Sequence, residues 1–175
     1  MRKASRTLRG TVAVALLVFA VAVARTAGLC WNSTGSAPAG LWRVTGTAWQ
    51  RGDMVLIDVP PDRPLFRAAR GRGYLRPGWT RSGCAPLLKR VIAIAGDRVD
   101  VAESIRVNGR LVPGSLVRAN DSRGRPLWRE ASSERVAPGM VWLISETPQF
   151  GFDSRYFGAL PAKLVRGRAQ PLVTW

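Results

Sequence analysis

Histidine is absent from this sequence of 175 residues. Its absence excludes every catalytic scheme that depends on an imidazole, including the Ser-His-Asp triad and the Cys-His pair, and every zinc site built on histidine ligands. A serine nucleophile in this chain therefore needs another general base. A lysine can fill that role, provided that its amine is neutral near the working pH.

Acidic residues are scarce, since 11 Asp and Glu stand against 27 Lys and Arg and leave a formal net charge of +16. Thirteen of these charges lie in two stretches that contain no acid, residues 1–25 and 63–90. The second stretch carries Gly, Pro and aromatic residues among its arginines, which is typical of a long exposed loop. Such a loop could bind phosphates, but we favour a solvated loop that rests on anionic lipid headgroups.

Long apolar runs are limited to one uncharged segment of 15 residues, 10–24, which follows four basic residues. This length suits the apolar region of a cleavable signal peptide, and Ala22-Val23-Ala24 has the small-x-small form of a cleavage site. A spanning helix of about 17 to 25 residues requires the segment to continue through residues 25–31. We favour this second alternative, an uncleaved signal anchor over residues 1–31. Either way the N-terminus stays in the cytoplasm and the following residues are exported.

The remainder of the chain, residues 32–175, predicts a single, mainly β domain with an antiparallel sheet. The 18 Gly and 12 Pro indicate many turns, no convincing helical period follows residue 31, and an Arg/Gly/Pro-rich loop is expected at residues 60–85. Asn108-Gly109 between alternating apolar residues predicts a hairpin with a type I′ turn. The expected strands and hairpins lie at residues 52–59, 87–101, 104–113, 139–146 and 164–175.

Lys89 is the lysine whose surroundings best fit a general base. It lies in a predicted strand among Leu87, Leu88, Val91 and Ile92. A free lysine titrates near 10.4, so burial must lower its pKa by about three units, or about 4 kcal/mol. The neighbouring Arg90 would point to the opposite face of the strand. Lys163 has a weaker apolar context, and a lysine beside an arginine on a strand is, taken alone, more often an exposed edge residue.

The segment "NSTGSAPAGLW", residues 32–42, supplies a candidate nucleophile. Ser36 lies between Gly35 and Ala37, small neighbours that would let a substrate backbone approach closely. If the segment is extended, Thr34 lies on the same face and could offer its hydroxyl to an oxyanion together with the Ser36 backbone N–H. The alternative is a Ser/Thr/Gly/Pro linker between membrane and domain, which spacing alone favours.

A series of motifs follows the apolar segment in a distinctive order: "STGSAPAGLW", "RGDMVLIDV", "LLKRVIAIAGD", "VNGRLVP", "FDSRYFG" and "VRGRAQP". In this order they resemble the signal peptidase I family of serine/lysine peptidases. The Pro-x-Gly-Leu-aromatic form after Ser36, "PLLKRV" and "FDSRYFG" are similar in particular to its conjugative-transfer branch, the TraF-type peptidases. The resemblance runs from about residue 5 to the C-terminus and implies a β domain of the signal-peptidase type.

The resemblance also implies a role for each matching residue. Ser36 is the nucleophile, Lys89 is the general base, and Thr34 falls where family members often place an oxyanion-hole hydroxyl. Three further residues, Asp153, Ser154 and Arg155, match the family's Asp-Ser-Arg box, which supports the catalytic centre. An Asp/Arg pair that fixes a turn between strands is a compatible structural explanation of that box.

One position departs from the family pattern. Housekeeping members tend to carry a Ser two residues before the Asp of the box, where it orients the lysine. In this chain that position is Gly151. Lysine positioning must then come from another group, or the chemistry is tuned differently.

The function that the resemblance implies is that of a membrane-bound serine endopeptidase that cleaves the precursor of a conjugative pilin. Some relatives also join the pilin's ends into a ring, which is chemically reasonable because water or an amine can resolve an acyl-enzyme on Ser36. The resemblance places the protein in the bacterial inner membrane with its catalytic domain in the periplasm. The pilin precursor is then its substrate, and other components of the transfer apparatus are further candidate partners.

Two other functions stay open. A general leader peptidase would use the same chemistry on other precursors. A non-enzymatic basic β domain would scaffold a transfer apparatus or bind nucleic acid through residues 63–90, although we do not favour nucleic acid as a partner. No cofactor is expected, because the sequence has neither a phosphate-binding Gly loop nor a metal-ligand cluster.

Two cysteines, Cys30 and Cys84, precede the candidate nucleophile and base by six and five residues. In an oxidising compartment the pair is able to form a disulfide that tethers the two segments, and free thiols are the equal alternative. Neither thiol suits a nucleophile, since no His is available to pair with it.

Overall fold

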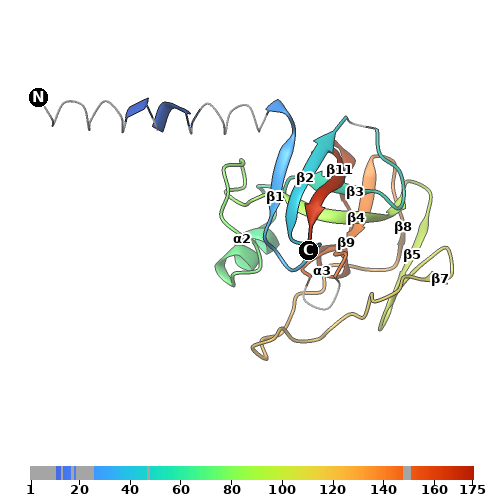
Figure 1. Ribbon diagram of the computed structural model, residues 1–175. Coiled ribbons are helices and arrows are strands. Elements are labelled where there is room, and N and C mark those ends of the chain that lie inside the picture. Colours follow the sequence, from blue (N-terminus) through green and yellow to red (C-terminus); the bar gives the residue numbers. More distant parts are fainter. Residues whose placement is uncertain (1–10, 13, 17, 19–25, 47, 148–150) are drawn as a thin grey trace, which may run out of the picture.

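The computed structural model describes residues 11–12, 14–16, 18, 26–46, 48–147 and 151–175. They form two antiparallel sheets (Figure 1). The larger sheet has the strand order β1 (Leu29–Asn32), β2 (Gly40–Thr45), β11 (Val165–Thr174), β3 (Met54–Ile57), β4 (Leu87–Ile94), β9 (Met140–Ile144) and β10 (Leu160–Pro161). The smaller sheet has the order β7 (Arg110–Leu111), β6 (Ile105–Val107), β5 (Arg98–Val101) and β8 (Glu134–Arg135).

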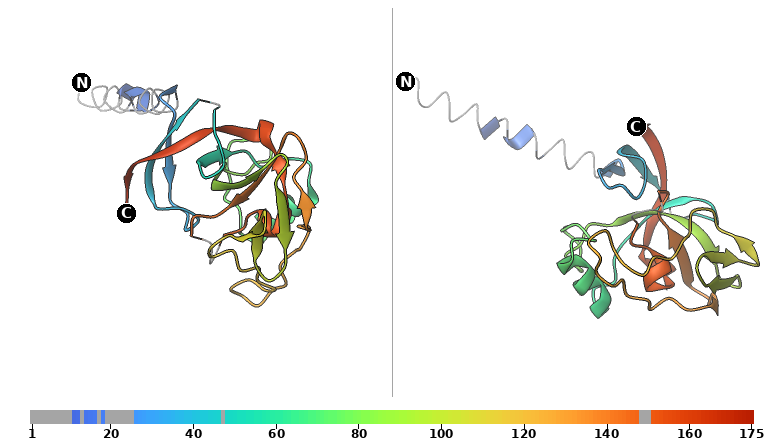
Figure 2. Two further views of the ribbon diagram at one scale, coloured as in Figure 1. Left: turned by 90° about the vertical axis from the view of Figure 1, so that its right-hand side faces the viewer. Right: turned by 90° about the horizontal axis from the view of Figure 1, so that it is seen from below.

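The C-terminal strand β11 lies inside the larger sheet, where it pairs with β2 on one side and β3 on the other. Figure 2 shows its end leaving the body of the domain beside β1. There the rings of Trp31 and Trp175 lie with their centroids 5.5 Å apart. The first strands and the last strand of the domain are thus joined at one edge of the sheet.

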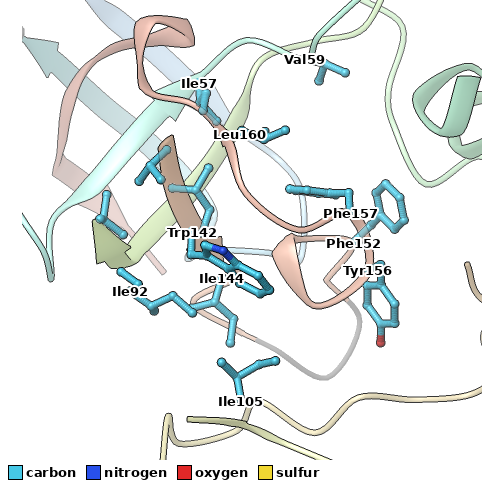
Figure 3. Close-up of a cluster of buried hydrophobic side chains, with 14 of the residues drawn as sticks. Ile57, Val59, Ile92, Ile105, Trp142, Ile144, Phe152, Tyr156, Phe157 and Leu160 are labelled. Carbon is cyan, nitrogen blue, oxygen red and sulfur yellow. The ribbon is translucent and has the colours of Figure 1, made fainter. Parts of the chain in front are cut away.

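The main hydrophobic core lies where the two sheets meet the short helix α3 (Ser154–Phe157). Trp142 of β9 is fully buried and Ile105 comes from the smaller sheet, while Phe152 precedes α3 and Phe157 is its last residue (Figure 3). The rings of Phe152 and Phe157 pack with their centroids 5.4 Å apart. β9 and α3 are in contact within this core, and α3 carries Ser154 and Arg155 of the candidate site.

Most of the expected strands are confirmed. The run at 52–59 contains β3, whose four residues are all buried, as an uninterrupted apolar run bounded by turns predicts. The run at 87–101 folds as β4, a turn and β5, and the run at 139–146 contains β9. Asn108 and Gly109 have φ of 51° and 78°, which confirms the expected hairpin turn with two left-handed residues.

The expectation of a long exposed loop at 60–85 is wrong over helix α2 (Pro64–Gly71). Pro64 opens the helix, where its missing N–H has no intrahelical partner to lose. Leu65, Phe66 and Ala69 form the buried face, and the arginines of the helix lie outside it. Only these three apolar residues indicate an amphipathic helix, and the surrounding arginines and glycines made the segment look like a loop in the sequence.

The expected signal anchor lies largely outside the described residues, and so do its basic N-terminal region and the cleavage site that would end at Ala24. The described residues between 11 and 18, including Val12, Val14 and Leu16, are helical and exposed. The expected continuation of the helix through residue 31 is wrong, because Leu29–Asn32 form β1 and pair with β2. Within the part of the chain that the structure describes, no helix has both the length and the apolar character needed to cross a membrane.

Candidate active site

The candidate nucleophile lies in the loop of residues 33–39, which joins β1 to β2. The two strands pair up to the loop, with Asn32 opposite Gly40. Inside the loop, the buried Asn32 side chain donates hydrogen bonds from Nδ2 to the carbonyl oxygens of Ala37 (2.9 Å) and Pro38 (3.0 Å). Asn32 therefore holds the loop in one shape, a role that the sequence alone did not reveal.

Thr34 and Ser36 meet inside this loop, with 2.9 Å between their hydroxyl oxygens. The expected extended segment is wrong, because the loop turns around Asn32, yet the turn still brings the two hydroxyls together. Thr34 donates its single hydroxyl proton to Asn32 Oδ1 at 2.7 Å. Ser36 must then be the donor to Thr34 Oγ1, so the serine proton points at Thr34 in this resting arrangement.

Lys89 lies in β4 with only 3% of its surface exposed. Because β4 pairs with β3 on one side and β9 on the other, the alternative of an exposed edge lysine is wrong. Burial lowers the pKa of Lys89 from 10.5 to about 8; nearby Asp153 opposes the shift and Arg155 adds to it. Lys163, the other lysine of the described residues, is exposed in the 3₁₀ helix η2 (Ala162–Leu164).

The Lys89 amine is held by a residue that the sequence did not single out. Its Nζ donates a hydrogen bond of 2.7 Å to Oγ of Ser145, which follows β9 and is 1% exposed. The next backbone N–H, that of Glu146, donates to the carbonyl oxygen of Ser36 at 2.7 Å. Two consecutive residues after β9 thus contact both the candidate base and the candidate nucleophile.

Arg90 points away from Lys89, as the two-residue period of a strand predicts. Its Nε donates to the carboxylate of Glu146 at 2.6 Å on the exposed side of the sheet. The pair Lys89-Arg90 is therefore joined to the pair Ser145-Glu146 on both faces. Ser145 and Glu146 were expected only as the end of the strand predicted at residues 139–146. Their contact with Lys89 and Arg90 could not be inferred from spacing, because 56 residues separate the partners.

The Asp-Ser-Arg box begins helix α3 and is fully inside the protein. Asp153 and Arg155 form a salt bridge of 2.8 Å, with side-chain exposures of 0% and 2%. Asp153 Oδ2 also accepts a hydrogen bond from the backbone N–H of Ser145 at 2.9 Å, and Ser154 Oγ accepts one from the Leu143 N–H. The box therefore supports the end of β9, and its link to Lys89 runs through Ser145.

Ser36, Thr34 and Lys89 all line one cleft of about 440 Å³. Its walls come from residues 30–36, from the start of β4, and from residues of the segments 73–76, 118–127 and 151–156. Leu56, Leu75 and Leu87 give these walls an apolar part. One cleft therefore brings together two hydroxyl-bearing residues, the buried Lys89 and an apolar wall.

The family model for signal peptidase, peptidase S26, matches residues 2–175 of this sequence. The chain belongs to the S26 signal peptidase family. A probable conjugal transfer protein TraF of Sinorhizobium fredii (strain NBRC 101917 / NGR234) is 40% identical, covering 98% of this chain and 94% of the relative. A plasmid transfer protein TraF of Escherichia coli is 36% identical, covering 85% of this chain and 84% of the relative.

A crystal structure of a signal peptidase I from Enterococcus faecalis V583 is also similar, at 20% identity. The match covers 69% of this chain and 96% of the other, with a TM-score of 0.41. Sequence and family model together confirm the resemblance to the conjugal-transfer members of the S26 family. At the level of the family this chain is a serine peptidase.

The cysteines of this S26 chain are both free thiols, so the disulfide alternative is not realised in the structure. Cys84 is buried in the core, and Cys30 lies in the cleft wall, where burial raises the pKa of its thiol. Within the described ranges, no three Cys, Asp or Glu side chains gather closely enough to hold a metal ion.

Proposed function

We propose that this chain is a membrane-bound serine endopeptidase in which Ser36 is the nucleophile and Lys89 the general base, and that its substrate is the precursor of a conjugative pilin. The observation that carries the catalytic part is the buried amine of Lys89, whose pKa is about 8, in the same cleft as Ser36. At pH 7 about a tenth of such an amine is neutral, roughly 300-fold more than for a lysine with the ordinary pKa.

The first chemical step follows from this arrangement. Neutral Lys89 takes the Ser36 hydroxyl proton while Ser36 Oγ bonds to the carbonyl carbon of the scissile peptide. The carbonyl oxygen gains the electron pair and accepts hydrogen bonds from the Ser36 N–H and from Thr34 Oγ1. For this, the Thr34 hydroxyl must turn away from Asn32, which holds it in the resting loop.

The second step divides the possible products. Lys89 returns its proton to the amine that leaves as the C–N bond breaks, and an ester on Ser36 remains. If Lys89 then deprotonates water, attack on the ester gives the cleaved, linear product. If the amino terminus of the same acyl chain attacks instead, a peptide bond closes a ring and no water is consumed.

The membrane location rests on apolar residues that remain exposed in the domain. They gather where β1 and the end of β11 meet and on the turn that follows α2: Trp31, Trp79, Leu172, Val173 and Trp175. Trp79 is 97% exposed. Aromatic side chains of this kind suit the bilayer interface. We therefore place the domain against the periplasmic face of the bacterial inner membrane, with the N-terminus in the cytoplasm.

The assignment to pilin maturation is supported by the names of the relatives that this chain resembles. Its relatives with 36–40% identity bear the names conjugal or plasmid transfer protein. A general leader peptidase would share the site chemistry and would differ in the precursors that it accepts. A role in transfer also suggests contact with other components of the transfer apparatus.

The alternative function, a non-enzymatic β domain that binds nucleic acid through its basic stretch 63–90, is less well supported. Arginines of that stretch contact the protein itself. Arg63 donates to Glu130 and to the Phe157 carbonyl oxygen, and Arg72 stacks over Trp128 at 3.9 Å. These contacts use arginines to hold α2 and its neighbours in place. Nucleic acid is accordingly not among the partners we propose.

Co-expression with a candidate pilin precursor tests the proposal. We expect mature pilin with the wild type and with the control Lys163→Ala, and none with Ser36→Ala or Lys89→Ala, as measured by the intact mass of the pilin. A mass lower by one water than that of the linear product would identify a ring. Equal processing by all four proteins would rule out Ser36 and Lys89 as the catalysts and make the binding domain the leading alternative.

A further inference from the structure

Gly151 faces a space that another residue already fills. A Cβ atom built on Gly151 would lie 1.8 Å from Ser145 Oγ and 2.4 Å from Ser145 Cβ, much closer than atoms that are not bonded can approach. Gly151 is not among the glycines with positive φ, so its backbone does not by itself require glycine. The Ser145 side chain is therefore the main obstacle to a side chain at position 151, and Asp153 Oδ2, at 3.0 Å from the added Cβ, leaves little further room.

The same hydroxyl is the partner of the Lys89 amine. Ser145 Oγ accepts the 2.7 Å hydrogen bond from Lys89 Nζ, and both side chains are buried. The backbone of Ser145 is fixed by its N–H donated to Asp153 Oδ2. A serine at position 151 would place its Cβ almost on this hydroxyl, so its own Oγ, one bond further, would lie within reach of the same amine.

We infer that Ser145 is the residue that positions Lys89, and that positions 145 and 151 are mutually exclusive sources of one hydroxyl at this point of the site. The inference rests on the proposed function of Lys89 as a base. Either position can supply the hydroxyl, provided that the other is glycine. In this chain Ser145, directly after β9, supplies it, and glycine at 151 leaves the room.

The hydroxyl matters because a lysine side chain is long and rotates about several bonds. A neutral amine that donates one N–H to Ser145 Oγ keeps its lone pair free for the Ser36 proton. Glu146, the next residue, holds the Ser36 carbonyl oxygen through its backbone N–H. The segment 145–146 therefore sets the distance between base and nucleophile, and small displacements of such groups lower rates on the order of 10²-fold.

A reciprocal exchange tests the inference. Full-length protein in detergent would be assayed on the purified candidate pilin precursor as wild type, Ser145→Ala, Ser145→Gly, Gly151→Ser and the double variant Ser145→Gly/Gly151→Ser. We expect kcat to fall on the order of 10²-fold in each single variant while KM stays within about threefold. In the double variant we expect kcat to return to within about fivefold of the wild type. Thermal unfolding of each variant shows whether it is folded.

The outcomes separate cleanly. A folded Ser145→Ala protein with wild-type kcat would overturn the inference, and so would a double variant no faster than the slower of its two single variants. Rescue in the double variant supports a positioning role, since a purely structural role for Ser145 does not predict that a hydroxyl at 151 restores turnover. Ser36→Ala and Lys89→Ala are measured alongside. If either still cleaves the precursor, the proposed function itself fails, whatever the Ser145 variants do.

Discussion

Two salt bridges in this molecule have similar geometry and opposite surroundings. Arg155 and Asp153 meet at 2.8 Å beneath the candidate active site, and Arg98 and Asp100 meet at 2.9 Å on the smaller sheet. The first pair is 2% and 0% exposed, and the second is 62% and 34% exposed. In the interior each charge depends on its partner, whereas on the surface water replaces a lost partner.

The contrast between buried and exposed charges also divides the basic residues of the protein into two groups. Most of the positive charge lies on the surface, where it is screened and has little effect on the chemistry. Two basic groups of the described residues, Arg155 and Lys89, are buried. Arg155 forms a salt bridge with Asp153, whereas the Lys89 amine donates to the uncharged Ser145 hydroxyl, and burial lowers the pKa of Lys89 to about 8. Lys89 is therefore the basic residue best suited to act as a general base, because burial disfavours the charged form of its amine.

The largest effect on stability is expected for Asp153→Asn. The substitution keeps the shape of the side chain but leaves the Arg155 guanidinium buried without a countercharge. We expect a loss of about 3–5 kcal/mol in the free energy of unfolding, measured by denaturant titration. The matched change Asp100→Asn at the exposed pair should cost less than about 1 kcal/mol. Similar losses for the two variants would contradict the contrast between interior and surface.

Lys89→Met should make the folded protein more stable while it abolishes activity. Below pH 8 the lysine is charged in both the folded and the unfolded chain, so the folded protein bears the full cost of the lowered pKa, about 3 kcal/mol. Between pH 8 and 10.5 the folded lysine loses its proton first and the cost disappears. Allowing about 1 kcal/mol for the lost bond to Ser145, we expect a gain of about 2 kcal/mol at pH 7 that reaches zero near pH 10 and becomes a small loss at pH 10.5.

Unfolding by denaturant at pH 7, 9 and 10.5 measures this gain, with Lys163→Met as the matched control on the surface. The control should be neutral at every pH. A Lys89→Met protein that is less stable than the wild type at pH 7 would mean that the amine is well solvated in the folded state.

The pH dependence of turnover should report the same amine. Because Lys89 must be neutral to accept the Ser36 proton, kcat/KM is expected to rise about tenfold per pH unit below pH 8 and to level off above it. Initial rates between pH 6 and 9.5 on the pilin precursor give this profile. A profile that is flat between pH 6 and 8 would separate catalysis from the titration of Lys89.

The parts of this structure that the sequence predicted are those in which neighbouring residues carry the information. The apolar run of β3, the Asn108-Gly109 turn and the opposite directions of Lys89 and Arg90 follow from short-range patterns. The contact of Ser145 with Lys89 does not, because it joins strands 56 residues apart through a small side chain with no periodic signal. The Asn32 bonds were missed for a different reason, since they depend on the shape of a turn.

Gly151 shows what the family resemblance could predict about the lysine-orienting hydroxyl and what it could not. The family pattern indicated that a lysine-orienting hydroxyl was absent from its usual place, but only the packing of β9 against residues 151–155 shows which residue fills it. Helix α2 was missed because its three buried residues stand among arginines, and a short apolar stripe is then outweighed by composition. In both cases tertiary contacts, not local preference, decide the structure.

The smallest effect is expected where the basic surface reaches the site. Arg76 donates from its guanidinium to Ser33 Oγ at 2.9 Å and to the Ser33 carbonyl oxygen at 3.2 Å, and it lines the same cleft as Ser36. These bonds are exposed, so Arg76→Gln should change the free energy of unfolding by less than about 0.5 kcal/mol. We expect KM for the pilin precursor to rise about threefold with kcat unchanged, because the bonds hold the rim of the loop rather than the reacting atoms. Arg81→Gln is the control, since Arg81 lies in the neighbouring loop closed by the Pro77–Cys84 bridge and does not line the cleft. A tenfold fall in kcat for Arg76→Gln would instead mean that this arginine takes part in the catalytic arrangement. The exposed basic residues could then no longer be regarded as a group without influence on the reaction.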